Sequence, residues 1–267
     1  MDKQQKAIFN RTERLLGAQA MKDLGDVKVI IFGVGGVGSW CAEGLIRSGI
    51  RHLTMVDPDR VCITNINRPL MATSSTVGKF KVEVLRDRLL DINPGADIQA
   101  IRSIYSADNW EDFRLGEYDY VIDAVDSLKD KAHLILKACE SGAVFFSSMG
   151  AALKTDPTRI RVAEFWQVRG CPLAAAIRKK FKRAGTLPAH KFLCVYDDEV
   201  LPNLGSEVHG CNEDCSYCPK GREIAFDSED RNKAKAVVNG TTAHITGIFG
   251  FTLCGLVIRD FCRRMKG

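Results

Sequence analysis

Hydrophobic and polar positions along the chain alternate between two kinds of pattern. Short apolar runs rich in β-branched residues predict strands at residues 27–32, 52–57, 97–104, 118–123 and 144–148. Between these runs, apolar positions at helical spacing predict helices at about residues 37–48, 78–90 and 129–141. Strands that alternate with helices predict an α/β fold with a Rossmann-like, mostly parallel sheet covered by helices.

The pattern changes in the second half of the chain. Alternating apolar and polar residues at 159–168 predict an antiparallel extension of the sheet. A basic helix is expected after Pro172, and a mostly apolar helix with a basic end is expected at residues 241–264. Apolar residues are sparse at about 203–236. We interpret that stretch as a cysteine-bearing insertion in a single domain that spans residues 1–267.

Composition narrows the class of protein. A chain of 267 residues with 45% hydrophobic residues can bury a sizeable core. The N-terminus has no apolar signal region, and the longest apolar stretch, at residues 243–258, is short and interrupted by His244 and Thr246. We therefore expect a cytoplasmic protein that does not cross a membrane. Its ten cysteines then indicate reduced thiols or metal ligands, and its net charge of +5 permits a nucleic-acid partner.

Glycines follow the first predicted strand in the spacing GxGxxG, at Gly33, Gly35 and Gly38, with Gly36 between them. Such a loop allows phosphate to approach the backbone, and the helix that follows offers free N–H groups to its charge. Asp57 ends the second predicted strand, where a carboxylate can accept hydrogen bonds from ribose hydroxyls. The arrangement suits either a dinucleotide or a triphosphate.

Polar residues beyond the second strand favour the triphosphate. They are Asp59, Asn65, Arg68, Lys81 and Asp126. Hydride transfer does not require such a set. Cleavage of ATP between its α and β phosphates does, because cationic side chains and a carboxylate that holds a metal ion stabilise the charge that develops on phosphorus and pyrophosphate.

At these positions the chain resembles the superfamily of ubiquitin-activating enzymes and their bacterial relatives MoeB and ThiF, which adenylate a carboxylate. The resemblance implies that Asp57 binds the ribose, and that Asn65, Arg68 and Lys81 contact the phosphates. It also implies magnesium at Asp126, and Arg14 or Arg11 reaching the triphosphate of a partner subunit in a homodimer. Pro69 departs from the family, which often has Gln there. We interpret Asp123 as a strand-end residue.

Four further motifs resemble one branch of this superfamily, the tRNA threonylcarbamoyladenosine dehydratases. They are VIDAVDS at 121–127, DPTRIRV at 156–162, CPLAAAIR at 171–178 and IFGF at 248–251. The resemblance implies that ATP adenylates a threonyl carboxylate on tRNA and that an internal carbamoyl atom then closes a ring. The basic helix offers five cations to RNA phosphates, although a solvated face is the alternative. These cations are Arg178, Lys179, Lys180, Lys182 and Arg183.

The sequence leaves two other functions open. As in MoeB and ThiF, the chain could adenylate the C-terminus of a ubiquitin-like sulfur carrier, with a sulfur-transfer protein as partner. Those relatives usually bind zinc through two separated CxxC pairs, whereas only one cysteine cluster is evident here. The chain could instead be a nucleotide-binding adaptor without catalysis. An adaptor would not need Arg68, Lys81 and Asp126, and all three are present.

The cysteine cluster consists of Cys211, Cys215 and Cys218. Its close spacing predicts a structural zinc site with Cys194 or His209 as fourth ligand, while free cysteines in an exposed loop and an iron–sulfur cluster are the alternatives. Other cysteines fall on apolar helix faces and are expected in the core, namely Cys41, Cys139 and Cys254. Cys171 and Cys194 remain open as relay nucleophiles.

Overall fold

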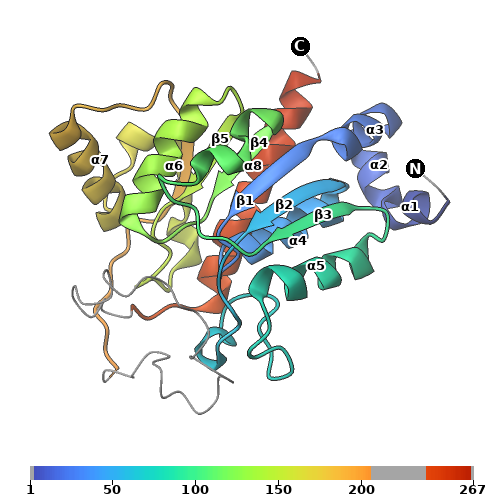
Figure 1. The fold of residues 1–267 in the computed structure, drawn as a ribbon. Coiled ribbons are helices and arrows are strands. Elements are labelled where there is room, and N and C mark those ends of the chain that lie inside the picture. The colour runs from blue at the N-terminus through green and yellow to red at the C-terminus, as the bar shows by residue number, and fades with distance from the viewer. Residues whose placement is uncertain (1–2, 206–238, 266–267) are drawn as a thin grey trace.

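The structure is a computed structural model that describes residues 3–205 and 239–265. It is organised around one sheet of seven strands (Figure 1). The strand order is β3-β2-β1-β4-β5-β7-β6, and every strand is parallel to its neighbour except β6, which runs antiparallel to β7. The strands are β1 (Lys28–Phe32), β2 (His52–Val56), β3 (Asp97–Ile101), β4 (Tyr120–Asp123), β5 (Val144–Ser148), β6 (Arg161–Glu164) and β7 (Leu193–Tyr196). The predicted fold class is confirmed.

Helices cover both faces of the sheet, with α4, α5 and α8 on one face and α6 and α7 on the other (Figure 1). They are α1 (Lys3–Ile8), α2 (Asn10–Leu16), α3 (Ala18–Asp26), α4 (Gly38–Ser48), α5 (Lys81–Ile92), α6 (Leu128–Glu140), α7 (Pro172–Ala184) and α8 (Ala243–Arg264). Residues of β1 alternate between the faces, with Val29 and Ile31 in one core and Ile30 and Phe32 in the other. Burial on both faces explains why the strand is apolar throughout.

The long helix α8 packs closely against α4. A Cβ at Gly250 would lie 2.5 Å from the carbonyl oxygen of Val37, and one at Gly44 would lie 2.9 Å from Cys254 Sγ. With 22 residues, α8 is long and apolar enough to cross a membrane, so the expectation that this stretch is too short was wrong. However, 56% of its most apolar window is buried inside the protein, and packing against α4 accounts for its composition.

Two parts of the fold were not predicted. The first is β7, which lies between β5 and β6 and provides the partner for the antiparallel strand. The second is the group of helices α1–α3, which precedes β1 at the amino-terminal ends of the parallel strands (Figure 1). The insertion predicted at about 203–236 lies outside the described residues from position 206 onward.

Candidate active site

The loop between β1 and α4 carries glycines with different roles. Gly33 has a positive φ of 84°, and a Cβ there would lie 2.7 Å from the carbonyl oxygen of Ala124. A Cβ at Gly38 would lie 1.9 Å from the carbonyl oxygen of Gly33. At Gly35, in contrast, an added Cβ would meet no atom of the described chain within 4 Å. The fold therefore requires glycine at positions 33 and 38. Gly35, in contrast, leaves room for a ligand beside the N-terminus of α4.

Asp57 directly follows β2 and is tied to this loop. Its carboxylate accepts hydrogen bonds from the backbone N–H of Val34 at 2.8 Å and from that of Asp59 at 2.9 Å. Burial raises the pKa of Asp57 above its ordinary value, and the Lys81 ammonium, 3.9 Å away, opposes that rise. The backbone contacts hold the side chain rigidly next to the glycine loop, where it can accept further hydrogen bonds.

Lys81 begins α5 and is almost fully buried, at 8% exposure. Its ammonium lies 2.6 Å from Asp59 Oδ2, and its backbone N–H donates to the carbonyl oxygen of Asp59 at 3.0 Å. Asp59 itself is largely exposed. The lysine is therefore fixed between two aspartates, and a phosphate group could replace the exposed carboxylate of Asp59 as its partner.

Arg68 lies in the loop between β2 and α5, opposite the loop that carries Asp126. Burial lowers the pKa of the Arg68 guanidinium, while the nearby negative charge of Asp126 acts to raise it. The guanidinium donates to the carbonyl oxygen of Thr64 at 3.1 Å, and Trp40 Nε1 donates to the carbonyl oxygen of Arg68 at 3.0 Å. Asn65 instead uses its side-chain oxygen to accept the N–H of Cys62 at 3.1 Å.

The two aspartates at the end of β4 and just beyond it differ sharply in their surroundings. Asp123 is fully buried, pairs with Lys131 at 2.7 Å and accepts the hydroxyl of Ser147 at 2.6 Å. Asp126, three residues later, is exposed. The interpretation of Asp123 as a strand-end residue is confirmed, and Asp126 is the carboxylate available to a ligand.

The beginning of α8 closes the site on a third side. The side chain of Thr246 packs so closely on Gly36 that a Cβ there would lie 3.1 Å from it. Asn67 donates from its side-chain amide to the carbonyl oxygen of Thr241 at 3.1 Å. The IFGF motif thus belongs to a helix whose first turn contacts the glycine loop, a relation that sequence reasoning missed.

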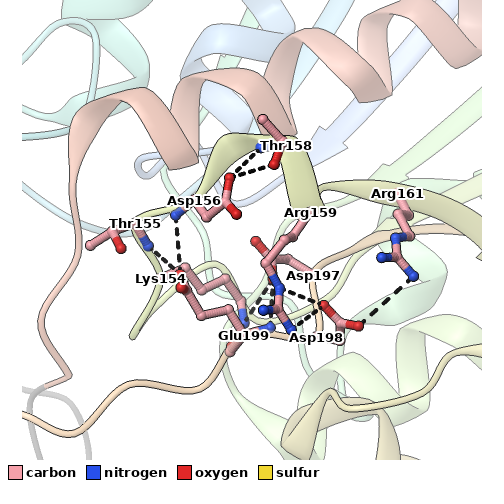
Figure 2. A network of polar contacts seen from close by, with 9 residues as sticks. All are labelled: Lys154, Thr155, Asp156, Thr158, Arg159, Arg161, Asp197, Asp198 and Glu199. Carbon is pink, nitrogen blue, oxygen red and sulfur yellow. Dashed lines mark hydrogen bonds and ion pairs between the residues drawn. The ribbon is translucent and has the colours of Figure 1, made fainter.

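Next to this site, the carboxyl ends of β5 and β7 carry a second polar cluster (Figure 2). Lys154 is buried, donates to the carbonyl oxygen of Glu199, and lies 4.0 Å from Asp197 Oδ1. Asp197 is fully buried, and within the described chain its Oδ2 has no hydrogen-bond partner. Leu153, just before Lys154, has a positive φ of 62°, which is uncommon for a residue with a branched side chain.

The DPTRIRV motif forms the outer part of the same cluster (Figure 2). Asp156 accepts the backbone N–H of Thr158 at 2.9 Å and begins a short 3-10 turn, Pro157–Arg159. Arg159 pairs with Asp198 at 2.9 Å, and hydrogen bonding from Arg159 lowers the pKa of Asp198. The motif thus braces the loop after β5 against the end of β7. Lys154, Asp197 and Glu199 were missed, although an acidic run directly after an apolar one signals such a strand end.

The predicted basic helix is α7, and its cations are not equivalent. Arg178 donates to the carbonyl oxygen of Phe165 at 2.9 Å and lies over the Phe165 ring, so it takes part in packing. Lys179, Lys180, Lys182 and Arg183 are exposed. A surface hollow of about 440 Å³ is lined by Ala175, Arg178, Lys179, Lys182 and Arg183. The exposed side chains form a cationic surface near the end of the sheet formed by β7 and β6.

The N-terminal arginines do not join this site within one chain. Arg14 lies in α2, is exposed, and donates from Nε to Asn10 Oδ1 at 3.1 Å. Arg11 belongs to the same helix. This helix lies with α1 and α3 at the amino-terminal ends of the strands, away from the glycine loop at their carboxyl ends (Figure 1).

Five cysteines of the described chain are buried, whereas Cys62 and Cys262 are only partly buried. Cys41, Cys139 and Cys254 are buried, as predicted. Cys171 and Cys194 are buried as well, and burial raises the pKa of Cys194 well above its usual value, which disfavours the thiolate needed of a nucleophile or metal ligand. The zinc site predicted at Cys211, Cys215 and Cys218, with His209, lies outside the described residues. Within residues 3–205 and 239–265, no group of three metal-binding side chains occurs.

A parallel sheet with a glycine loop, a strand-end carboxylate and facing cations defines a nucleotide-binding α/β protein. The model of the ThiF family matches residues 9–263. The chain is 34% identical over 258 residues to the tRNA threonylcarbamoyladenosine dehydratase of Bacillus subtilis, covering 97% of this chain and 96% of that protein. The Escherichia coli tRNA N6-threonylcarbamoyladenosine dehydratase in complex with ATP superposes with a TM-score of 0.80 at 28% identity, covering 99% and 98% of the two chains.

The likeness to a molybdopterin-synthase adenylyltransferase covers less of the chain. A probable molybdopterin-synthase adenylyltransferase of Gracilaria tenuistipitata is 31% identical over 124 residues, which is 46% of this chain and 34% of that protein. The chain therefore belongs to the ThiF family and, within it, to the tRNA threonylcarbamoyladenosine dehydratases, as its motifs predicted.

Proposed function

We propose that the protein uses ATP to cyclise threonylcarbamoyladenosine in the anticodon loop of tRNA, with loss of one water molecule. The observation that carries this proposal is the 34% identity with the Bacillus subtilis dehydratase, which extends over 97% of the chain. The convergence of Asp57, Arg68, Lys81 and Asp126 around the glycine loop supports it, because each supplies a group that adenylation requires.

Each of these groups has a role toward ATP in the proposal. Gly33, Gly35, Gly36 and Gly38 let the phosphates approach the N-terminus of α4, and Asp57 accepts the ribose hydroxyls. The Lys81 ammonium exchanges its contact with Asp59 for a contact with a phosphate. Arg68 neutralises charge on the phosphates next to Asp126. Asn65 first has to release the N–H of Cys62 before its side chain can turn to a phosphate.

Asp126 fits a magnesium site of one particular kind. Mg²⁺ in ATP-dependent enzymes is typically held by one or two carboxylates together with phosphate oxygens and water, so a single exposed carboxylate facing the phosphate side is sufficient. Asp123 does not contribute, because it already pairs with Lys131. When bound, magnesium would neutralise charge on the departing pyrophosphate.

The reaction has two steps in this proposal. The threonyl carboxylate attacks the α phosphorus of ATP, the bond to the bridging oxygen breaks, and pyrophosphate leaves with the electron pair. A carbamoyl atom of the same substrate then attacks the activated carbonyl carbon, loses its proton, and expels AMP. The carboxylate oxygen leaves with AMP, so the substrate loses the elements of water without a nucleophile from the enzyme.

The proposal includes further elements outside the ATP site. The exposed cations of α7 contact tRNA phosphates, with Arg178 placing the helix and contributing charge. A homodimer lets Arg14 or Arg11 of one subunit reach the triphosphate of the other. The domain is single and cytoplasmic, like a soluble tRNA-modifying enzyme, and zinc at the cysteines of the insertion would hold that segment folded.

Adenylation of a ubiquitin-like sulfur carrier is the second candidate, with a sulfur-transfer protein as its partner. Measurement of pyrophosphate release from ATP separates the two candidates. The enzyme is incubated with ATP and Mg²⁺, and then with tRNA that carries threonylcarbamoyladenosine, tRNA that lacks it, or a sulfur-carrier protein. We expect only the modified tRNA to stimulate pyrophosphate release, and we expect its nucleoside to lose the mass of water. Stimulation by the sulfur carrier alone would refute the tRNA substrate.

A further inference from the structure

A buried lysine next to the active site has no role in the chemistry above. Lys131 lies in α6, and its side chain is 0% exposed. Its ammonium lies 2.7 Å from Asp123 Oδ2 and donates to the carbonyl oxygen of Val125 at 2.8 Å. The same carboxylate accepts the backbone N–H of Val125 at 3.0 Å. Both polar groups of Val125 are therefore held by one buried ion pair.

Stability alone is a poor reason for such a pair. Replacing a buried ion pair by apolar residues of similar volume is often neutral or stabilising, because burial removes both charges from water. Removing one partner alone costs about 3–5 kcal/mol, because the other charge is then left buried without compensation. A pair that remains in the core is better explained by the conformation that it imposes on its surroundings.

The ion pair fixes the backbone next to Asp126, the residue that follows Val125. The peptide bond between Val125 and Asp126 is trans, so its C=O and N–H groups point to opposite sides. With the Val125 carbonyl directed to Lys131, the N–H of Asp126 points away from the buried pair. On the other side of Asp126, the hydroxyl of Ser127 donates to Asp130 at 2.7 Å and caps α6. Asp126 is thus exposed between two fixed residues.

We propose that Lys131 is a positioning residue for the ATP site: through the carbonyl of Val125 it holds Asp126 in the orientation that engages the magnesium and phosphates of bound ATP. This inference rests on the proposed function of Asp126. Lys131 touches neither ATP nor the RNA, and it acts because Asp123 and Ser147 anchor its charge to β4 and β5.

The test uses paired substitutions that leave no lone charge in the core. In the double variant Asp123→Asn and Lys131→Met, Asn keeps an acceptor for the N–H of Val125, while the donor to its carbonyl is lost. The matched control is the double variant Asp197→Asn and Lys154→Met. It removes a second buried lysine–aspartate pair, which also lies at the carboxyl ends of the parallel strands. Both proteins are examined as full-length chains by thermal unfolding.

The main measurement is binding of ATP by calorimetry, with Mg²⁺ and with a chelator, together with binding of AMP. For the variant at 123 and 131 we expect AMP affinity close to wild type, but a loss of about 10- to 100-fold in the Mg²⁺-dependent part of ATP affinity, as for other groups that orient a metal ligand. The control should keep the wild-type dependence on Mg²⁺, because its lysine holds Glu199 and not the loop of Asp126.

Several outcomes would overturn the inference. The first is a folded variant at 123 and 131 that responds to Mg²⁺ as the wild type does. If this variant does not fold, replacement of both residues by Leu provides a second protein without the donor. Failure of both to fold while the control folds would make the pair a stability element and would also refute the positioning role. Because these assays contain no tRNA, a failure of the proposed RNA reaction would be detected separately.

Discussion

Gly35 should be needed for ATP and dispensable for folding, unlike its neighbours in the glycine loop. A methyl group added at Gly35 meets no atom of the described chain within 4 Å, and the backbone there is not left-handed. The substitution Gly35→Ala should therefore change the free energy of unfolding by no more than about 1 kcal/mol. The same methyl group, however, occupies the space through which phosphate approaches the backbone N–H groups.

The expected loss of affinity follows from the contacts that the methyl group displaces. A hydrogen bond from a backbone N–H to a charged phosphate oxygen contributes about 1.5–3 kcal/mol. Loss of one such bond should weaken ATP binding by about 10- to 100-fold. Gly38→Ala is the matched comparison, because its Cβ would lie 1.9 Å from the carbonyl oxygen of Gly33. The clash is with a backbone oxygen, which cannot turn aside as a flexible side chain can, so the substitution should destabilise the fold by about 1–3 kcal/mol or more.

Chemical denaturation and calorimetric titration with ATP measure the two effects separately. The reasoning would be refuted if Gly35→Ala bound ATP as tightly as wild type, since the open space at this glycine would then not face the ligand. It would equally fail if Gly38→Ala were as stable as Gly35→Ala, because the distances at these two positions differ so greatly.

Four further predictions address the other parts of the site. Asp126→Ala should abolish AMP release and shift the free energy of unfolding by no more than about 0.5 kcal/mol, because the side chain is exposed; near wild-type AMP release would remove the magnesium assignment. Mixing that variant with Arg11→Ala/Arg14→Ala should restore about a quarter of wild-type AMP release, because half of the dimers then contain one complete site. No recovery, with subunit exchange verified, would refute the role in trans. Replacing the lysines of α7 at 179, 180 and 182 by Gln should lower the log–log salt slope of tRNA binding by up to about 0.7–0.9 per lost phosphate contact, without a change in ATP affinity; identical slopes would mean that this helix is a solvated face. Burial, with a smaller effect of Lys137, lowers the pKa of His133. The folded state therefore binds this proton less tightly, and stability is lost as pH falls below about 6.5 through the lowered pKa. His133→Gln should reduce that acid-side decrease in Tm, and an unchanged decrease would contradict the reasoning.

Much of the fold could be predicted from local sequence because its signals are local. The apolar runs that became β1, β2, β4 and β5 are buried on both faces, so their composition alone distinguished them from helices. The glycine spacing and the aspartate after β2 likewise identified the nucleotide-binding end of the sheet. The short strand β7 was missed because its four residues carry too little pattern, and only its neighbours β5 and β6 make it part of the sheet.

The tertiary structure decided what the individual polar residues do. Asp123 and Asp126 are the same residue type three positions apart, and only the packing of α6 buries one against Lys131 and leaves the other exposed. A signal was present, because Lys131 lies on the buried stripe of α6 with Leu134, Ile135 and Ala138. A lysine on such a stripe needs a partner, but its partner comes from a neighbouring strand. Residue type and spacing thus determine which groups are available, whereas burial and distance determine which of them meet each other and which meet the ligand.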